Sequence, residues 1–169
     1  MGGKNILPMK ELTAILEKLG SEKVKTYIQS GNAVFMHNEK DTKRLADDII
    51  TAIKKSKGFK PHLLILTKTE LEKAITSNPF PEAEAEPKTL HVFFMDSKPG
   101  KPNFDKMDDI KTDTEEYKLT GKFFYLYAPD GVGRSKLAAG AEKLLGVPAT
   151  ARNRRTVMKL YEMASDLHK

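Results

Sequence analysis

The first part of the chain alternates between the residue spacing of helices and that of strands. Apolar side chains recur at steps of three and four over residues 8–19 and again over 41–56, which predicts two amphipathic helices. Between these helices, β-rich runs at 24–28 and 33–37 flank a short polar connection containing Gly-Asn, which is typical of a hairpin. The apolar run at 62–66 predicts a buried strand.

The rest of the chain continues this alternation, now beginning with a strand. Residues 89–95 are apolar on both alternating sets of positions, so we expect this strand inside a sheet that is covered on both faces. A second hairpin is predicted across Thr120-Gly121. The spacing then predicts two helices, over about 134–145 and about 155–165.

Polar residues mark the starts of further helices. Asp41 is a favoured N-cap for the helix that follows it. Thr67 and Glu70 have the spacing of a capping box, which predicts a short helix that ends before Asn78. The segment 97–109 is rich in Pro and Gly at first and then turns into a short helix.

The order of elements predicts an α+β fold with two ferredoxin-like βαββαβ-type halves and C-terminal helices. We expect residues 1–67 to form the first half and residues 68–169 to form the second, which includes those helices and shares a core with the first. The first half begins with a helix and so lacks its N-terminal strand. That strand is central in a ferredoxin-like half, so we expect either a gap between the strands at 33–37 and 62–66 or a swapped strand that fills it.

The composition excludes several classes of site chemistry. The 169 residues include no Cys, which excludes disulfides, thiolate nucleophiles and Cys-bearing metal sites. The four His residues lack the spacing that puts two ligands on one helix face, so no metal site is expected. The sequence shows neither a signal peptide nor an apolar run of about 18 residues, which predicts a cytoplasmic protein that does not enter a membrane.

Positive charge is concentrated near the C-terminal end. Residues 131–160 hold seven Lys and Arg residues and one acidic residue, Glu142, so this segment alone carries the net charge of +6 that the whole chain has. Concentrated basicity attracts phosphate groups, but a solvated helix face with unpaired Lys and Arg gives the same pattern. Both interpretations stay open at this point.

Two glycine-containing segments lie directly before predicted helices. Residues 131–136 combine exposed backbone N–H groups with Arg134 and Lys136, and N–H groups at a helix start favour anions. Residues 2–5 offer the same chemistry through Lys4, although a tight turn between a strand and a helix explains them equally. Neither segment has the Gly-x4-Gly-Lys-Ser/Thr spacing of a P-loop, and no cofactor is expected.

Aromatic residues alternate along the last predicted strand. Phe123, Tyr125 and Tyr127 face one way, and an open face beside the basic residues would stack bases as single-strand RNA-binding sheets do. The alternative is that this face is buried in a sheet covered on both sides. Arg152 and Asn153 have a structural alternative too, because Asn is a favoured N-cap for the final helix.

Four segments match one pattern in order and spacing over nearly the whole chain. They are Gly-Gly-Lys-Asn at 2–5, Thr-Tyr-Ile-Gln-Ser-Gly-Asn at 26–32, Gly-Arg-Ser-Lys-Leu at 133–137, and Thr-Ala-Arg-Asn with Thr-Val and Lys-Leu within 150–160. Together they resemble domain-of-unknown-function family 1697. The resemblance implies an α+β fold and no established activity.

The chain departs from the pattern of that family at two places. Proteins of the family usually carry a strand that ends in Arg-Gly-Ile-Asn directly before the Gly-Gly-Lys segment, so we expect a start upstream of Met1 or a truncated sequence. The family tends to place Trp after the Arg-Asn pair, whereas this chain has Arg154, which adds charge and puts a stacking role in doubt.

These observations favour a binding protein for a phosphate-bearing ligand or nucleic acid. The alternatives are an enzyme acting on a small phosphorylated or nucleotide-like substrate, and a protein-interaction module without a small ligand. No catalytic residue is assigned, because Ser30 lacks the Gly-x-Ser-x-Gly frame of a nucleophile elbow. The predicted anion contacts lie at junctions between elements, and we expect their loops to lie close together. These contacts are Gly3, Lys4, Gln29, Ser30, Asn32, Arg134, Ser135, Lys136, Arg152, Asn153 and Arg155.

Overall fold

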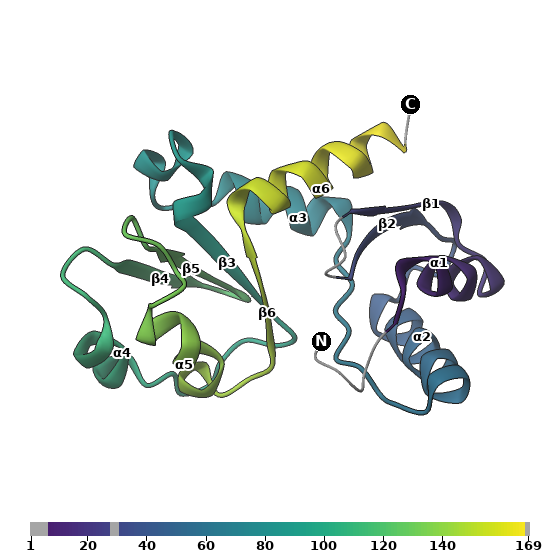
Figure 1. Ribbon diagram of the computed structural model, residues 1–169, viewed down its shortest axis with the longest axis horizontal. Coiled ribbons are helices and arrows are strands. Elements are labelled where there is room, and N and C mark those ends of the chain that lie inside the picture. Colours follow the sequence, from purple (N-terminus) through teal and green to yellow (C-terminus); the bar gives the residue numbers. More distant parts are fainter. Residues whose placement is uncertain (1–6, 28–30, 168–169) are drawn as a thin grey trace. The chain divides into compact units, whose positions relative to one another are not determined.

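The computed structural model describes residues 7–27 and 31–167. The chain divides into two compact units by its internal contacts. The first unit comprises Met1–Leu71 together with Lys159–Lys169, and the second comprises Glu72–Met158. Figure 1 shows the helices and strands of each unit.

The first unit contains a two-stranded hairpin against which two helices pack. Its elements are α1 (Met9–Lys18), β1 (Glu22–Tyr27), β2 (Asn32–Met36) and α2 (Thr42–Lys57). The strands pair antiparallel, with Tyr27 opposite Asn32. The structure therefore confirms the two helices and the hairpin that the apolar spacing predicts.

Capping residues fix the ends of the helices as the sequence predicts. The Asp41 carboxylate accepts hydrogen bonds from the backbone N–H groups of Lys43 and Arg44, at 3.1 and 3.2 Å, and begins α2. Gly58 ends the helix in the left-handed conformation, at φ +81°. Helix α3 (Lys68–Thr76) begins at a capping box, in which Thr67 and Glu70 each bond to the backbone N–H of the other.

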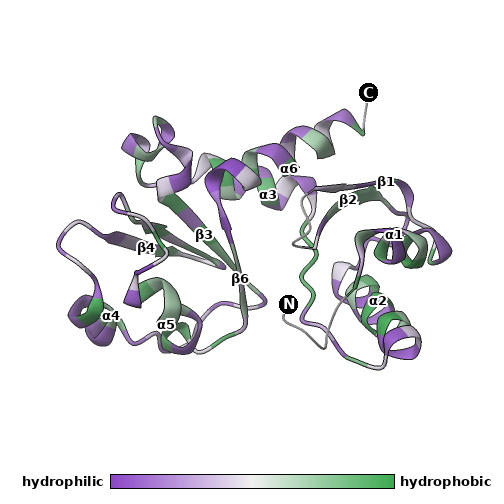
Figure 2. Cartoon of the chain, viewed as in Figure 1, coloured by the Kyte–Doolittle hydropathy of each residue, from purple (hydrophilic) through white to green (hydrophobic). Residues whose placement is uncertain are grey.

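The core of the first unit lies between its helices and one face of the hairpin. The buried side chains are Leu7, Leu12, Leu16, Leu45, Ile49 and Ile53. Ala33 and Phe35 of β2 pack against this cluster and are partly buried. Figure 2 shows hydrophobic and hydrophilic residues alternating around α1 and α2, which is the amphipathic pattern that directs one helix face into the core.

The predicted strand at 62–66 is wrong. Residues 59–67 form neither helix nor strand. Leu63 and Ile65 pack against the helical cluster, so the apolar pattern correctly indicates a segment at the core. A strand also needs a ladder of backbone hydrogen bonds, and among residues 7–27 and 31–167 β2 pairs only with β1.

The second unit contains a four-stranded antiparallel sheet. Its elements are β3 (Leu90–Met95), α4 (Phe104–Ile110), β4 (Glu116–Thr120), β5 (Phe123–Tyr127), α5 (Lys136–Leu145) and β6 (Ala149–Asn153). The strand order is β4-β5-β3-β6, which makes β3 a central strand. Two 3₁₀ turns, Pro81–Glu84 and Pro87–Thr89, precede β3. Helix α6 (Arg154–Asp166) follows β6 directly.

The hairpin, the central strand and the helices of this region are confirmed, but β6 is not predicted by the sequence pattern. The five residues Ala149–Asn153 carry no β-branched or aromatic side chain except Thr150. The local preference of these residues for a strand is weak, and hydrogen bonding to β3, with Phe93 opposite Ala151, holds them in strand conformation. Tertiary hydrogen bonding thus determines this edge strand.

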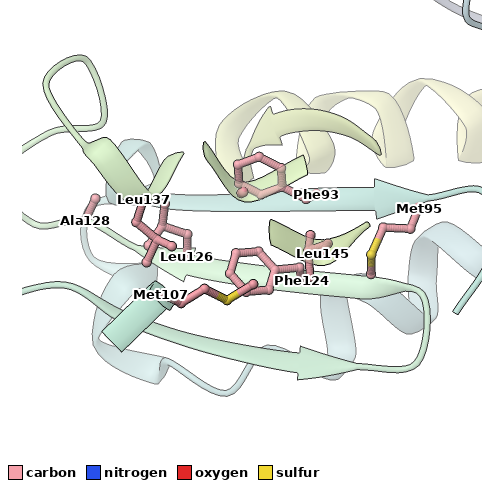
Figure 3. Packing of buried hydrophobic residues seen from close by; sticks show 9 residues of the cluster. Phe93, Met95, Met107, Phe124, Leu126, Ala128, Leu137 and Leu145 are labelled. Atoms are coloured by element: carbon pink, nitrogen blue, oxygen red, sulfur yellow. The ribbon is translucent and has the colours of Figure 1, made fainter. Parts of the chain in front are cut away.

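The core of the second unit forms between the sheet and helices α4 and α5. Phe93 and Met95 of β3, Phe124 of β5, Met107 of α4 and Leu145 of α5 meet there (Figure 3). On the other face, Val92 and Phe94 are also buried, so β3 is covered on both sides as predicted.

The chain is an α+β protein whose described residues form six α-helices and two antiparallel sheets. The sequence pattern assigns all of 68–169 to one half, whereas the contacts place residues 159–169 with the first unit. Within residues 7–27 and 31–167, no helix has the length and apolar character needed to cross a membrane.

Candidate anion-binding site

The direction of the strands brings two basic segments to one end of the four-stranded sheet. β3 runs antiparallel to both neighbours, with Leu90 opposite Tyr127 of β5 and His91 opposite Asn153 of β6. β5 and β6 therefore end where β3 begins. Two strand spacings separate their ends, about 10 Å. We call this end of the sheet, together with the loop after β5 and the first turn of α6, the basic end.

The loop after β5 leads into α5 and carries the first basic pair. Gly131 adopts the left-handed conformation at φ +99°, which favours glycine there. Ser135 is buried, and its hydroxyl accepts a hydrogen bond from the N–H of Ala138 at 3.0 Å, so it is the N-cap of α5. Arg134 and Lys136 on either side of it are exposed. The cap orders the helix start and leaves both cations at the surface.

The end of β6 leads into α6 and carries the second basic group. The Asn153 side-chain oxygen accepts a hydrogen bond from the N–H of Thr156 at 2.9 Å, which confirms the expected N-cap. Arg152 is partly buried, donates to the carbonyl oxygen of Ala151 at 2.8 Å, and has its pKa lowered by burial. Arg155 is exposed.

Arg154 does not add its charge to this surface, contrary to the prediction. Its guanidinium is buried and pairs with the Glu84 carboxylate at 3.3 Å. Glu84 lies in the 3₁₀ turn Pro81–Glu84, so this turn holds the Arg154 side chain in place. Sequence reasoning missed the pair because 70 residues separate its two members.

Both helices at the basic end begin with cations that no acidic side chain in the first turn offsets. Lys136 opens α5, Arg155 lies in the first turn of α6, and neither first turn holds an Asp or Glu, while Arg154 is already paired with Glu84. The partial positive charge of a helix N-terminus disfavours cations there by about 0.3–1 kcal/mol each. An anion bound at this end would relieve that repulsion.

The prediction of an open aromatic face that stacks bases is wrong, and the alternative that this face is buried is correct. Tyr125 is fully buried and Phe123 is 9 % exposed. The Tyr127 ring stacks on Phe80, with centroids 5.8 Å apart. These rings pack within the second unit and leave no open row along β5 for bases.

Part of the predicted contact set lies in the second unit. Arg134, Ser135, Lys136, Arg152, Asn153 and Arg155 all lie at the basic end. Asn32 lies in the first unit and is buried. Gly3, Lys4, Gln29 and Ser30 lie outside the described residues, so the convergence of all the motifs stays a prediction. The described part of the chain holds no group of three metal-ligating side chains.

His91 is a feature of the basic end that the sequence reasoning did not single out. It lies opposite Asn153 in the β3–β6 ladder. Its Nδ1 atom is buried and has no hydrogen-bond partner among the described residues, and burial lowers the pKa of the ring. The one ionisable residue within the apolar strand at 89–95 was the available signal.

Tyr117 in β4 offers a test of local electrostatics. Its hydroxyl donates to the Asp108 carboxylate at 2.6 Å, and burial together with Asp108 raises the pKa of Tyr117 to about 12. We expect Asp108→Asn to lower the pKa of the Tyr117 phenol without restoring its ordinary value, because burial remains. Tyrosinate absorbance in an alkaline titration measures this, with Asp109→Asn as the matched control and Tyr117→Phe identifying the signal. An unchanged titration in Asp108→Asn would contradict the assignment.

Fold and site together define an α+β protein with cationic helix starts gathered at one sheet end. The chain belongs to a family described as "Protein of unknown function (DUF1697)", whose model matches residues 1–125. It is also similar to a solved structure, the conserved bacterial protein SP0830 from Streptococcus pneumoniae. The two are 22% identical with a TM-score of 0.67, over 97% of this chain and 92% of that chain. This likeness concerns the fold alone. A comparison with curated proteins finds no match.

Proposed function

We propose that this protein binds a phosphate-bearing ligand at the basic end of its second unit. The observation that carries the proposal is that α5 and α6 both begin at this end with cations and without acidic residues. Backbone N–H groups at helix starts and Lys or Arg side chains are the groups that hold phosphates. Arg134, Lys136, Arg152 and Arg155 supply the charge in this proposal.

The ligand is recognised mainly through its phosphates. Phe123 and Tyr125 are buried, so stacking on β5 contributes nothing to binding. Phosphate contacts fix position and orientation and carry no sequence information. We therefore expect a nucleic acid strand to bind whatever its base sequence. A smaller molecule would be held through its phosphates in the same way.

We also propose that both halves of the chain have the ferredoxin-like βαββαβ-type arrangement. Its support is the second unit, where a strand–helix–strand–strand–helix–strand order accompanies the sheet order β4-β5-β3-β6. Gly3, Lys4, Gln29, Ser30 and Asn32 are retained as proposed further contacts, and a cytoplasmic location as the proposed setting.

Binding of a single-stranded oligonucleotide at several salt concentrations tests the proposal. Each Lys or Arg contact to phosphate contributes about −0.7 to the slope of log affinity against log salt. We expect Arg134→Glu combined with Lys136→Glu to weaken binding and to reduce the magnitude of the slope by about 1.4.

The matched control reverses two charges at the opposite end of the same sheet. Lys98 and Lys122 are exposed there, and the Lys122 carbonyl accepts from the N–H of Met95 at the end of β3. Lys98→Glu with Lys122→Glu changes net charge equally and should alter the slope much less. Equal effects of the two pairs would show that only net charge matters and would refute a site at the basic end.

A second experiment distinguishes a nucleic acid from a small phosphate-bearing molecule as the ligand. Thermal-shift measurements with nucleotides and sugar phosphates report binding through stabilisation of the folded state. Stabilisation by a small phosphate that the Arg134 and Lys136 reversals abolish supports the small-ligand form. Absence of binding in both arms at low salt overturns the proposal.

A further inference from the structure

Lysines gather where the end of α2 meets the start of α1. The ammonium group of Lys57, the last residue of α2, pairs with the carboxylate of Glu11 in the first turn of α1 at 2.6 Å. This ion pair places the two helix ends side by side, and Figure 1 shows both helices. The lysines of these helix ends and of the segment directly after α2 are Lys10, Lys54, Lys55, Lys57 and Lys60, which we call the lysine cluster.

Glu11 offsets one of the five charges of the lysine cluster. Within residues 7–27 and 31–167, Glu11 pairs with Lys57, and the other four lysines are exposed and form no ion pair. The residues outside these ranges include no Asp or Glu. In α2 the nearest acidic residue is Asp48, six positions before Lys54 and about 9 Å along the helix axis, which is close to the Debye length at physiological salt. In the described part of the chain, four positive charges of the cluster therefore face solvent unpaired.

Helix dipoles do not account for the whole cluster. A cation in the last turn of a helix is favoured, which explains Lys54 and Lys55. Lys60 lies beyond α2, after Gly58 has ended the helix. Lys10 lies in the first turn of α1, where the dipole disfavours a cation. An anionic partner would interact favourably with all four of these side chains.

We propose that the lysine cluster binds the phosphate backbone of a nucleic acid strand. Lysine binds phosphate as a point charge without a fixed orientation, whereas bidentate pairing with a carboxylate uses arginine. The cluster has five lysines and no arginine. Lysine is also depleted at interfaces between proteins, so the composition of the cluster favours a nucleic acid over an acidic protein.

The surroundings of the cluster disfavour a membrane as the partner. Binding to a lipid surface needs apolar side chains beside the charges. Phe59, which lies within the cluster, packs against the core of the first unit. The exposed large apolar side chains of the described chain, Phe104 and Met158, belong to the second unit. The lysine cluster thus offers charge alone, which is what a phosphate backbone requires.

The test measures how the affinity of the full chain for a labelled single-stranded oligonucleotide depends on salt. The variant combines Lys54→Gln, Lys55→Gln and Lys60→Gln, because glutamine keeps the helix preference of lysine and removes the charge. Each lost phosphate contact changes the slope of log affinity against log salt by about 0.7, so we expect the magnitude of the slope to fall by about 2. Circular dichroism verifies that the variant stays folded.

The matched control removes three exposed lysines from elsewhere in the first unit. It combines Lys18→Gln, Lys25→Gln and Lys43→Gln, which changes net charge by the same amount. Lys18 is in the last turn of α1, so the control also loses a favourable helix-dipole interaction. We expect the control to alter the slope much less than the cluster variant does.

Protection from acetylation locates the contact. The bound oligonucleotide should protect Lys54, Lys55 and Lys60 of the unsubstituted chain from a lysine-acetylating reagent, while Lys25 reacts as it does in the free protein. Protection confined to lysines outside the cluster would overturn the proposal. Equal effects of the two triple substitutions on the salt slope would show that only net charge matters and would overturn it as well.

Two further results separate this surface from the alternatives. Tighter binding to vesicles containing phosphatidylserine than to the oligonucleotide, lost in the cluster variant, would assign the lysines to a membrane and overturn the proposal. A salt slope that falls with Arg134→Glu and Lys136→Glu but not in the cluster variant would overturn it too, and would leave the site at the basic end intact. The converse result would support the lysine cluster and refute the site at the basic end.

Discussion

Replacing Phe124 by Ala is expected to destabilise the second unit by about 3–5 kcal/mol. The ring is fully buried and lies between Phe93 and Tyr117, with centroids 5.6 Å from each. Its removal loses both the transfer free energy of the aromatic ring and the contacts that its neighbours make with it. Native-state hydrogen exchange of amides in β3 and β5 measures the loss within this unit.

Phe104→Ala is the matched control for this substitution. Phe104 stacks on Tyr117 but is 42 % exposed, so truncating it removes far less buried apolar surface. We expect it to cost about 1 kcal/mol or less. Comparable destabilisation by the two variants would contradict the assignment of Phe124 to the centre of the core.

Tyr125→Phe is expected to cost about 1–3 kcal/mol although it deletes a single oxygen atom. Tyr125 is fully buried, and its hydroxyl donates to the carbonyl oxygen of Ala74 at 2.6 Å. The substitution keeps the aromatic ring. It leaves the carbonyl oxygen of Ala74, a buried residue, without the hydroxyl group that donates to it. Denaturant unfolding at neutral pH measures the change, and a neutral result would show that water replaces the lost donor.

The same residue predicts how stability depends on alkaline pH. Burial raises the pKa of Tyr125 to about 12, while the positive charge of Arg154 acts in the opposite direction. The unfolded chain ionises this phenol near 10, so the folded state holds the proton more tightly. Stability is retained below about pH 10 and declines as pH rises towards 12. Tyr125→Phe should remove part of that decline, and an identical pH profile would refute this contribution.

The sequence predicts well what neighbouring residues determine. The N-cap at Asp41, the capping box at Thr67 and the N-cap at Asn153 each join residues no more than three positions apart. The hairpins at β1–β2 and β4–β5 are likewise local. Helix periodicity identified α2 and α5, because one apolar face suffices to define an amphipathic helix.

Features that depend on distant partners were predicted poorly. β6 is a strand because β3 pairs with it, whereas the run at 62–66 joins no strand ladder within the described part of the chain. Apolar content alone gives the opposite answer for both segments. The sequence predicts that Arg154 adds positive charge to the surface. The prediction fails because Glu84, which pairs with Arg154, lies 70 residues away in the sequence. Of the candidate site, the sequence located the basic residues but not His91, whose place depends on the register with β6.

The central position of β3 also determines the order in which the sheet can assemble. Residues that pair across the β4–β5 turn, Thr120 and Phe123, are three positions apart, so this hairpin closes the smallest loop. Phe93 and Phe124 pair across 31 positions, and His91 and Asn153 across 62. Loop-closure entropy grows with separation, so we expect β3 to join a preformed hairpin and β6 to add last. On this expectation the basic end is completed in the final step of folding, because half of its cations arrive with β6 and the start of α6.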